Sequence, residues 1–123
     1  MTTTEAGAVL AANAAFYQAM RAGDFEAMER LWTRRRQLSC THPGRPMIRG
    51  RVAVMSSWRR ILLRGHPVRI EPLDPVAVVT GRSALVLCRE DVGGGQMMAS
   101  NAFVLEAEGW RMLSHQAAKI PGS

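Results

Sequence analysis

Apolar residues recur with a helical period along the first half of the chain. Over residues 6–21 the apolar positions are spaced three or four residues apart, which predicts an amphipathic helix. Gly23 suits the left-handed cap at the end of this helix, and Asp24 suits the cap that begins a second, shorter one. A third helix is predicted over 51–63, where Gly65 follows its end.

The second half of the chain changes to a strand period. Strands are predicted over 37–41, 76–80, 83–91, 96–106 and 110–118, with a loop over 44–49 and glycine-containing turns between the later strands. Helices followed by an antiparallel meander indicate an α+β fold, with the helices packed on one face of a curved sheet. We expect one domain over 1–123, with residues 1–5 frayed.

Both faces of the strand predicted over 96–106 are apolar. Met97 and Phe103 fall on one face, and Met98 and Val104 fall on the other. A sheet that packs helices on one face normally shows a polar opposite face. The surplus of apolar residues therefore predicts that the outer face is covered by a second copy of the chain, in a homodimer.

Composition limits the class of protein. The chain has 123 residues, of which 47% are hydrophobic, enough for a single core. No run approaches the roughly 20 apolar residues of a spanning helix, and the N-terminus lacks the pattern of a signal peptide. Cys40 and Cys88 have no metal-binding or redox spacing. We expect a cytoplasmic protein with two free thiols and no membrane partner.

The net charge of +6 raises the question of nucleic-acid binding. The run Arg34-Arg35-Arg36 can bind phosphate, but cations are also favoured at the C-terminal end of a helix, and we prefer that interpretation. No aromatic residues interleave with the arginines, as single-strand binders require. Nucleic acid is therefore the partner that we rank last.

A histidine at the end of a strand is the first candidate for chemistry. His42 is followed at once by Pro43 and Gly44, which end a strand and open a turn, so its imidazole lies at the rim of an element. The ring can be a pocket group or a structural cap bonded to a nearby carbonyl. Asn101 lies on an apolar strand face, where a buried amide needs hydrogen-bond partners, and this favours a pocket or a polar network.

The order of these landmarks resembles a known family. They are Gly23-Asp24, His42-Pro43-Gly44, Gly50, Ser57-Trp58, Glu90, Asn101-x-Phe103, Gly109-Trp110-Arg111 and Ser114-His115. Together, over about residues 8–118, they resemble the SnoaL-like branch of the nuclear transport factor 2-like superfamily. The resemblance implies a conical α+β barrel of three N-terminal helices packed on a strongly curved mixed or antiparallel sheet. It also implies an internal pocket and dimers formed through the outer sheet face. The superfamily contains isomerases, cyclases, dehydratases and non-catalytic kinase-association domains, so the fold leaves the chemistry open.

The ketosteroid isomerases of this superfamily provide a pattern for the site. By resemblance, His42 stands at the position of the general base, Phe16 at that of an oxyanion-hole tyrosine, and Asn101 at that of the second oxyanion donor. A phenyl ring donates no hydrogen bond, and losing one such donor costs about 10²–10³ in rate. We therefore do not expect steroid-type isomerisation by that mechanism. His42 remains as a candidate base and Asn101 as a candidate hydrogen-bond donor.

The last strand supplies further candidates. Met112, Ser114 and Gln116 share the face that we expect to look inward, which would turn His115 outward. Many relatives carry His-His where this chain has His115-Gln116, and this difference weakens any role for the second histidine in proton transfer. The predicted ligand-binding residues are Phe16, Trp32, His42, Trp58, Met97, Asn101, Ser114 and Gln116. We expect no metal and no cofactor, because the histidines and cysteines have no ligand spacing.

Two functions follow from these observations. The first is binding of a small apolar ligand that bears a carbonyl or hydroxyl group, with isomerase or dehydratase chemistry in which His42 is the base. The second is a non-catalytic dimerisation or association module, in which the sheet face matters and the pocket is a remnant of packing. The sequence identifies neither the ligand nor whether a reaction takes place.

Overall fold

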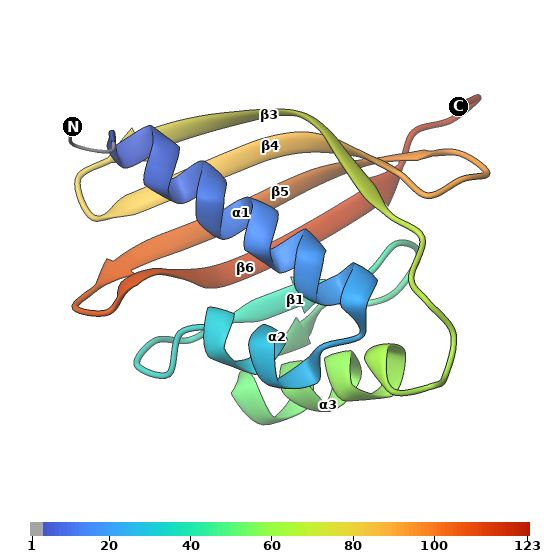
Figure 1. The fold of residues 1–123 in the computed structure, drawn as a ribbon, viewed down its shortest axis with the longest axis horizontal. Coiled ribbons are helices and arrows are strands. Elements are labelled where there is room, and N and C mark those ends of the chain that lie inside the picture. The colour runs from blue at the N-terminus through green and yellow to red at the C-terminus, as the bar shows by residue number, and fades with distance from the viewer. Residues whose placement is uncertain (1–3) are drawn as a thin grey trace.

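Three helices lie on one side of a single sheet (Figure 1). The structure is a computed structural model that describes residues 4–123. The helices are α1 (Glu5–Ala22), α2 (Phe25–Leu31) and α3 (Arg51–Leu62). The hydroxyl of Thr4 accepts a hydrogen bond from the Gly7 amide at 3.0 Å and caps α1. Thr4 and Glu5 thus belong to the capped start of α1, and residues 1–3 of the stretch expected to be frayed lie outside the described part.

The turn between α1 and α2 has the predicted caps. Gly23 adopts a φ of 63°, and the amides after the helix end return to the carbonyls of Ala19 and Met20. Asp24 begins α2, and its carboxylate accepts from the Ala27 amide at 3.0 Å. A Cβ on Gly23 would lie 3.2 Å from the Leu62 carbonyl oxygen, so the turn packs closely on the end of α3.

The six strands form one mixed sheet in the order β2-β1-β6-β5-β4-β3. Their bounds are β1 (Ser39–Thr41), β2 (Ile48–Arg49), β3 (Glu71–Thr80), β4 (Ser83–Asp91), β5 (Gln96–Glu106) and β6 (Gly109–Lys119). β1 runs parallel to β6, and all other neighbours are antiparallel. The predicted α+β class is confirmed. The predicted loop over 44–49 contains the two-residue strand β2, which is too short to show a period in the sequence.

A β-bulge in β6 decides which residues of this strand face the helices. Ala102 pairs with Ser114 and Phe103 with Met112, so Leu113 is the extra residue. An extra residue reverses the alternation beyond it. His115 is therefore buried and Gln116 exposed, and the predicted inward set of Met112, Ser114 and Gln116 is wrong beyond Met112.

The core fills the layer between the helices and the inner sheet face, which α1 crosses diagonally (Figure 1). The outer face is less covered. Val76, Val78, Leu85 and Met98 on β3, β4 and β5 are 58%, 53%, 38% and 45% exposed. Their exposure marks an apolar strip on the face that the sequence assigns to a dimer. None of the helices within residues 4–123 is long and apolar enough to cross a membrane.

Candidate functional site

A cavity of about 1010 Å³ opens between the loop after β1, helix α3, the segment before β3, and the adjoining ends of β4 and β5. Its apolar walls include Met20, Ile48, Trp58, Ile61, Ile70 and Met97. Its polar and titratable groups are His42, Ser57, Glu90 and His115, and the exposed side chains of Arg45, Arg60 and Arg64 lie at its opening. Two further hollows, both bordered by Arg35, contain neither imidazole nor thiol. The cavity beside His42 is therefore the candidate site.

His42 follows β1 directly and is held against α3. Its Nε2 lies 2.6 Å from the Ser57 hydroxyl oxygen, and its ring meets Trp58 edge to face with centroids 4.9 Å apart. Burial lowers the pKa of His42, and the positive charge of Arg45 lowers it further. The imidazole is thus neutral near pH 7, accepting from Ser57 in one tautomer and donating to it in the other.

His115 is the second imidazole of the cavity, and its tautomer follows from its partners. Its Nδ1 lies 2.6 Å from the Asn101 side-chain oxygen, while the Asn101 nitrogen donates to the Asn13 oxygen at 2.9 Å and the Tyr17 hydroxyl at 3.0 Å. An amide oxygen only accepts, so Nδ1 carries the hydrogen and Nε2 keeps its lone pair. Burial, with a smaller contribution from the charge of His42, lowers the pKa of His115 to about 3.

Glu90, on β4, ends the same network. The Tyr17 hydroxyl donates to the Glu90 carboxyl at 2.5 Å and lies 3.3 Å from the Cys88 sulfur. Glu90 is only 2% exposed, and burial raises its pKa although the bond from Tyr17 opposes this. Hydrogen bonds therefore run in one direction from His115 through Asn101 and Tyr17 to Glu90. Both ends of this chain line the cavity.

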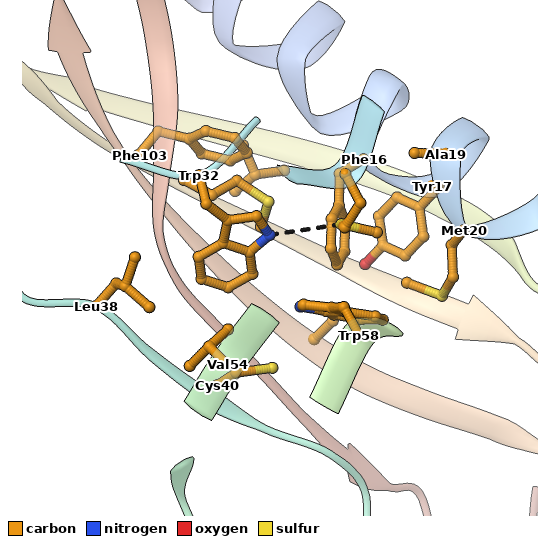
Figure 2. Close-up of a cluster of buried hydrophobic side chains, with 14 of the residues drawn as sticks. Phe16, Tyr17, Ala19, Met20, Trp32, Leu38, Cys40, Val54, Trp58 and Phe103 are labelled. Carbon is orange, nitrogen blue, oxygen red and sulfur yellow. Dashed lines mark hydrogen bonds between the residues drawn. The ribbon is translucent and has the colours of Figure 1, made fainter. Parts of the chain in front are cut away.

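Aromatic side chains cluster with Trp58, which lines the cavity, in the buried core (Figure 2). Phe16 is fully buried, with its ring centroid 4.9 Å from that of His115 and 5.5 Å from that of Trp58. Trp32 donates from its indole nitrogen to the Met28 sulfur at 3.4 Å, the dashed line in Figure 2. The indole N–H of Trp58 has no hydrogen-bond partner within residues 4–123. Phe16 and Trp32 thus form solid core, while Trp58 forms both core and wall.

The two thiols are buried and free. Burial raises the pKa of Cys40 to about 12, and burial also raises the pKa of Cys88. Both side chains therefore remain thiols near neutral pH, and neither is an activated nucleophile.

The structure brings only part of the predicted ligand-binding set to the cavity. His42, Trp58 and Met97 line it, whereas Phe16, Trp32 and Asn101 lie buried outside the lining. Ser114 bonds to Ser39 across the β1–β6 pair, and Gln116 is exposed, because the bulge turns both away from the helices. Ligand binding by any of these residues stays a prediction.

Sequence reasoning missed Tyr17, Ser57, Glu90 and His115 as members of the site. The signal for Glu90 was present, because Ala84, Val86 and Cys88 alternate with it along the correctly predicted strand over 83–91. Tyr17 directly follows Phe16. The resemblance placed Phe16 at the position of the oxyanion-hole tyrosine, so Tyr17 was not considered. His115 was hidden by the bulge, which has no glycine or other obvious mark in the sequence.

Solved structures with the same architecture define the fold as nuclear transport factor 2-like. A candidate dehydratase of this fold from Streptomyces avermitilis is 34% identical, with a TM-score of 0.86 over 92% of this chain and 94% of that one. A candidate calcium/calmodulin-dependent protein kinase type II association domain from Thiobacillus denitrificans is 27% identical, with a TM-score of 0.75 over 90% and 94% of the two chains. A candidate ketosteroid isomerase from Parabacteroides distasonis, at 11% identity and a TM-score of 0.71 over 93% and 86%, shares the fold alone.

Within this fold, residues 9–121 match the SnoaL-like domain. The chain therefore belongs to the SnoaL-like domain family, as the resemblance predicted. It is also 26% identical over 118 residues to the F-box protein SKIP8 of Arabidopsis thaliana, an alignment that covers 90% of this chain and 49% of that protein. The chain thus spans about half the length of that relative.

Proposed function

We propose that the protein binds a small, largely apolar molecule bearing a carbonyl or hydroxyl group in the cavity beside His42 and transfers a proton on it. The observation that carries the proposal is the convergence of His42, His115 and Glu90 on one cavity with apolar walls. Burial shifts the pKa of all three toward the uncharged form. A neutral base that lines the same cavity as a carboxyl group of raised pKa is a pairing that general acid–base catalysis uses.

His42 is the proposed base. It is only partly buried, it adjoins the opening, and the Ser57 hydroxyl orients its ring. Asn101 takes a positioning role, because both hydrogens of its amide are already given to Asn13 and Tyr17. It acts on the ligand only through His115, whose Nδ1 hydrogen it accepts.

The proton transfer has two forms on such a ligand. In an isomerisation, His42 removes a proton from the carbon beside the carbonyl and returns it to another carbon. In a dehydration, His42 removes the same proton while the Glu90 carboxyl, in its protonated form, transfers its proton to the leaving hydroxyl, which departs as water. The likeness to the candidate dehydratase at 34% identity supports the second form. Neither form needs a metal or cofactor.

Deuterium uptake tests the proposal directly. The bicyclic ketone 1-tetralone in D₂O, followed by proton NMR, reports removal of the proton beside its carbonyl. We expect wild type to accelerate uptake and His42→Ala to lose about 10²-fold or more of that acceleration. Met97→Trp, which fills the cavity, should abolish it, and Gln116→Ala on the outer face is the matched control. Equal uptake in wild type and Met97→Trp would place the activity elsewhere and overturn the proposal.

The second candidate function is a non-catalytic association module. The observation that favours it is the likeness to the kinase association domain at 27% identity. In this case the outer sheet face is the working surface, and the cavity is left by packing. Thermal shifts with 1-tetralone and its alcohol separate the two functions. An association module predicts no shift in wild type, whereas the enzyme predicts a shift that Met97→Trp removes.

We further propose that two copies pair through the outer sheet face. Its exposed apolar strip of Val76, Val78, Leu85 and Met98 supports this arrangement. Light scattering at micromolar concentration should show a dimer that Val78→Lys with Leu85→Arg converts to a monomer. A monomeric wild type would contradict it.

The two free, buried thiols support the cytoplasm as the compartment.

A further inference from the structure

Three arginines surround the opening of the cavity. Arg45 lies in the loop after β1, Arg60 in the last turn of α3, and Arg64 just beyond that helix. All three are exposed. Among residues 4–123, no carboxylate forms an ion pair with any of the three, and none of the three guanidinium groups makes a hydrogen bond.

Some other arginines of the protein have partners within the described residues. Arg35 reaches Glu106 and Glu108 at 3.3 Å and 3.1 Å, and Arg59 lies over the Phe25 ring at 5.4 Å. The helix dipole explains a cation in the last turn of α3, where Arg60 stands. The dipole also favours Arg64, which directly follows the C-cap Leu63, but it does not explain Arg45, which lies in the loop after β1.

The charge at the opening is not balanced from inside the cavity. Glu90 is the sole carboxyl among its lining residues, and that carboxyl is buried and bonded to Tyr17. The charge of Arg45 also reaches inward, since it contributes to lowering the pKa of His42. An anion at the opening would therefore meet three guanidinium groups and no opposing exposed carboxylate of the lining.

We propose that the ligand is an amphipathic organic anion, with its apolar body between Met97 and Ile61 and one carboxylate or sulfonate held at the opening by Arg45, Arg60 and Arg64. The proposal rests on the proposed function, because it concerns the same cavity. The anion proposal adds a fixed orientation of the ligand in the cavity. The anionic end stays at the opening, and the apolar body reaches toward His42 and Glu90.

Two fluorescent probes that differ in one group provide the test. 8-Anilinonaphthalene-1-sulfonate and N-phenyl-1-naphthylamine share the same rings, and only the first carries a sulfonate. Exposed ion pairs are individually weak, so we expect the three arginines together to favour the sulfonate by about tenfold in affinity. Added salt should weaken binding of the sulfonate probe and leave binding of the neutral probe nearly unchanged.

Two triple variants with the same change in net charge make the comparison specific. Arg45→Gln with Arg60→Gln and Arg64→Gln should lower the affinity for the sulfonate probe about tenfold. The affinity of this variant for the neutral probe should stay within about twofold of that of wild type. The control is Arg30→Gln with Arg34→Gln and Arg36→Gln. These arginines are exposed and border the hollows near Arg35 rather than the cavity, and both probes should bind the control as they bind wild type.

Cavity-filling variants separate failure of this proposal from failure of the proposed function. Met97→Trp, or Ile61→Trp if the first does not fold, should abolish binding of both probes. If it does so while both probes bind wild type equally, the cavity is a binding site and the anion preference is wrong. The preference is also wrong if the control variant loses as much sulfonate affinity as the opening variant. If neither filling variant weakens either probe, the probes bind elsewhere, and both proposals fall.

Discussion

The two ends of the layer between helices and sheet are built differently on the same strands. At one end Trp32, Phe103 and Met112 are fully buried and fill the space. At the other end the same strands, β5 and β6, present Met97 and His115 to an open cavity. The closed end contributes contacts between apolar groups, and the open end contributes a hydrogen-bonded network of polar groups.

The two ends therefore respond differently to substitution. Close packing at the closed end makes each side chain costly to remove. At the open end, the groups of the network from His115 to Glu90 are costly only when a partner is lost, since each of them is satisfied by another. The bulge at Leu113 lies between the two ends and lets one strand serve both, by changing which residues face inward.

The largest expected effect is at the closed end. Trp32→Ala removes a fully buried indole and should lower the free energy of unfolding by about 3–5 kcal/mol. Trp58→Ala should cost less, because Trp58 already borders the cavity and water can fill the enlarged space. Urea unfolding of the two variants measures the difference. Equal losses would show that the two ends are packed alike and would break the comparison.

The next effect is at the polar network. Asn101→Leu keeps the branched shape of the side chain, with two larger methyl groups in place of its polar atoms. It leaves the Nδ1 hydrogen of His115 without its acceptor and the Asn13 oxygen without its donor. We expect a loss of about 2–3 kcal/mol in urea unfolding, because orphaned buried groups cost about 1–3 kcal/mol each. Ala102→Ser, at the next position of β5 and on its opposite face, is the control and should change little. A near-neutral Asn101→Leu would mean that the network adds nothing to stability.

The third effect is a pH dependence from the buried imidazole. The pKa of His115 is about 3 in the folded protein against 6.5 in the reference state, so between these values the unfolded chain binds a proton that the folded chain does not. Stability contributed by the neutral ring is therefore complete above pH 6.5 and is lost as the pH falls toward 3. The slope for one proton is at most about 1.4 kcal/mol per pH unit.

Comparison with a variant separates the contribution of His115 to the pH dependence of stability from the contributions of other groups. His42, whose pKa is also lowered, changes stability in the same direction, whereas Glu90, whose pKa is raised, opposes it above its reference value of 4.5. His115→Asn keeps a donor for Asn101 and does not titrate. Urea unfolding between pH 5 and 7 should be flatter for this variant than for wild type. Parallel curves would show that His115 is not the buried neutral group.

The sequence predicts the elements well where the apolar period is regular, whereas the strand predicted over 76–80 begins at Glu71 in the structure. Two strands, 83–91 and 96–106, have their predicted bounds, and the caps at Gly23 and Asp24 are confirmed, because apolar spacing and cap chemistry are local properties. The short strand β2 is missed, since two residues carry no period.

The site is less predictable because it depends on contacts between distant segments. Asn101 was recognised as a buried amide, but its partners Asn13 and Tyr17 lie 88 and 84 residues away in the sequence. The faces of β6 were assigned from a regular alternation, and a single extra residue reversed them beyond Leu113. Residue types were thus visible in the sequence, while their convergence was decided by strand register.

The smallest expected effect tests that register directly. Gln116→Ala should change the free energy of unfolding by less than about 0.5 kcal/mol, because the side chain is exposed beyond the bulge. His115→Ala, one residue earlier, should cost several times more, since it opens a buried space beside Phe16 and removes the donor to Asn101. The ratio of the two losses in urea unfolding reports which of the neighbours faces the helices. A regular strand without the bulge would reverse it, with Gln116→Ala the more costly change and His115→Ala nearly neutral.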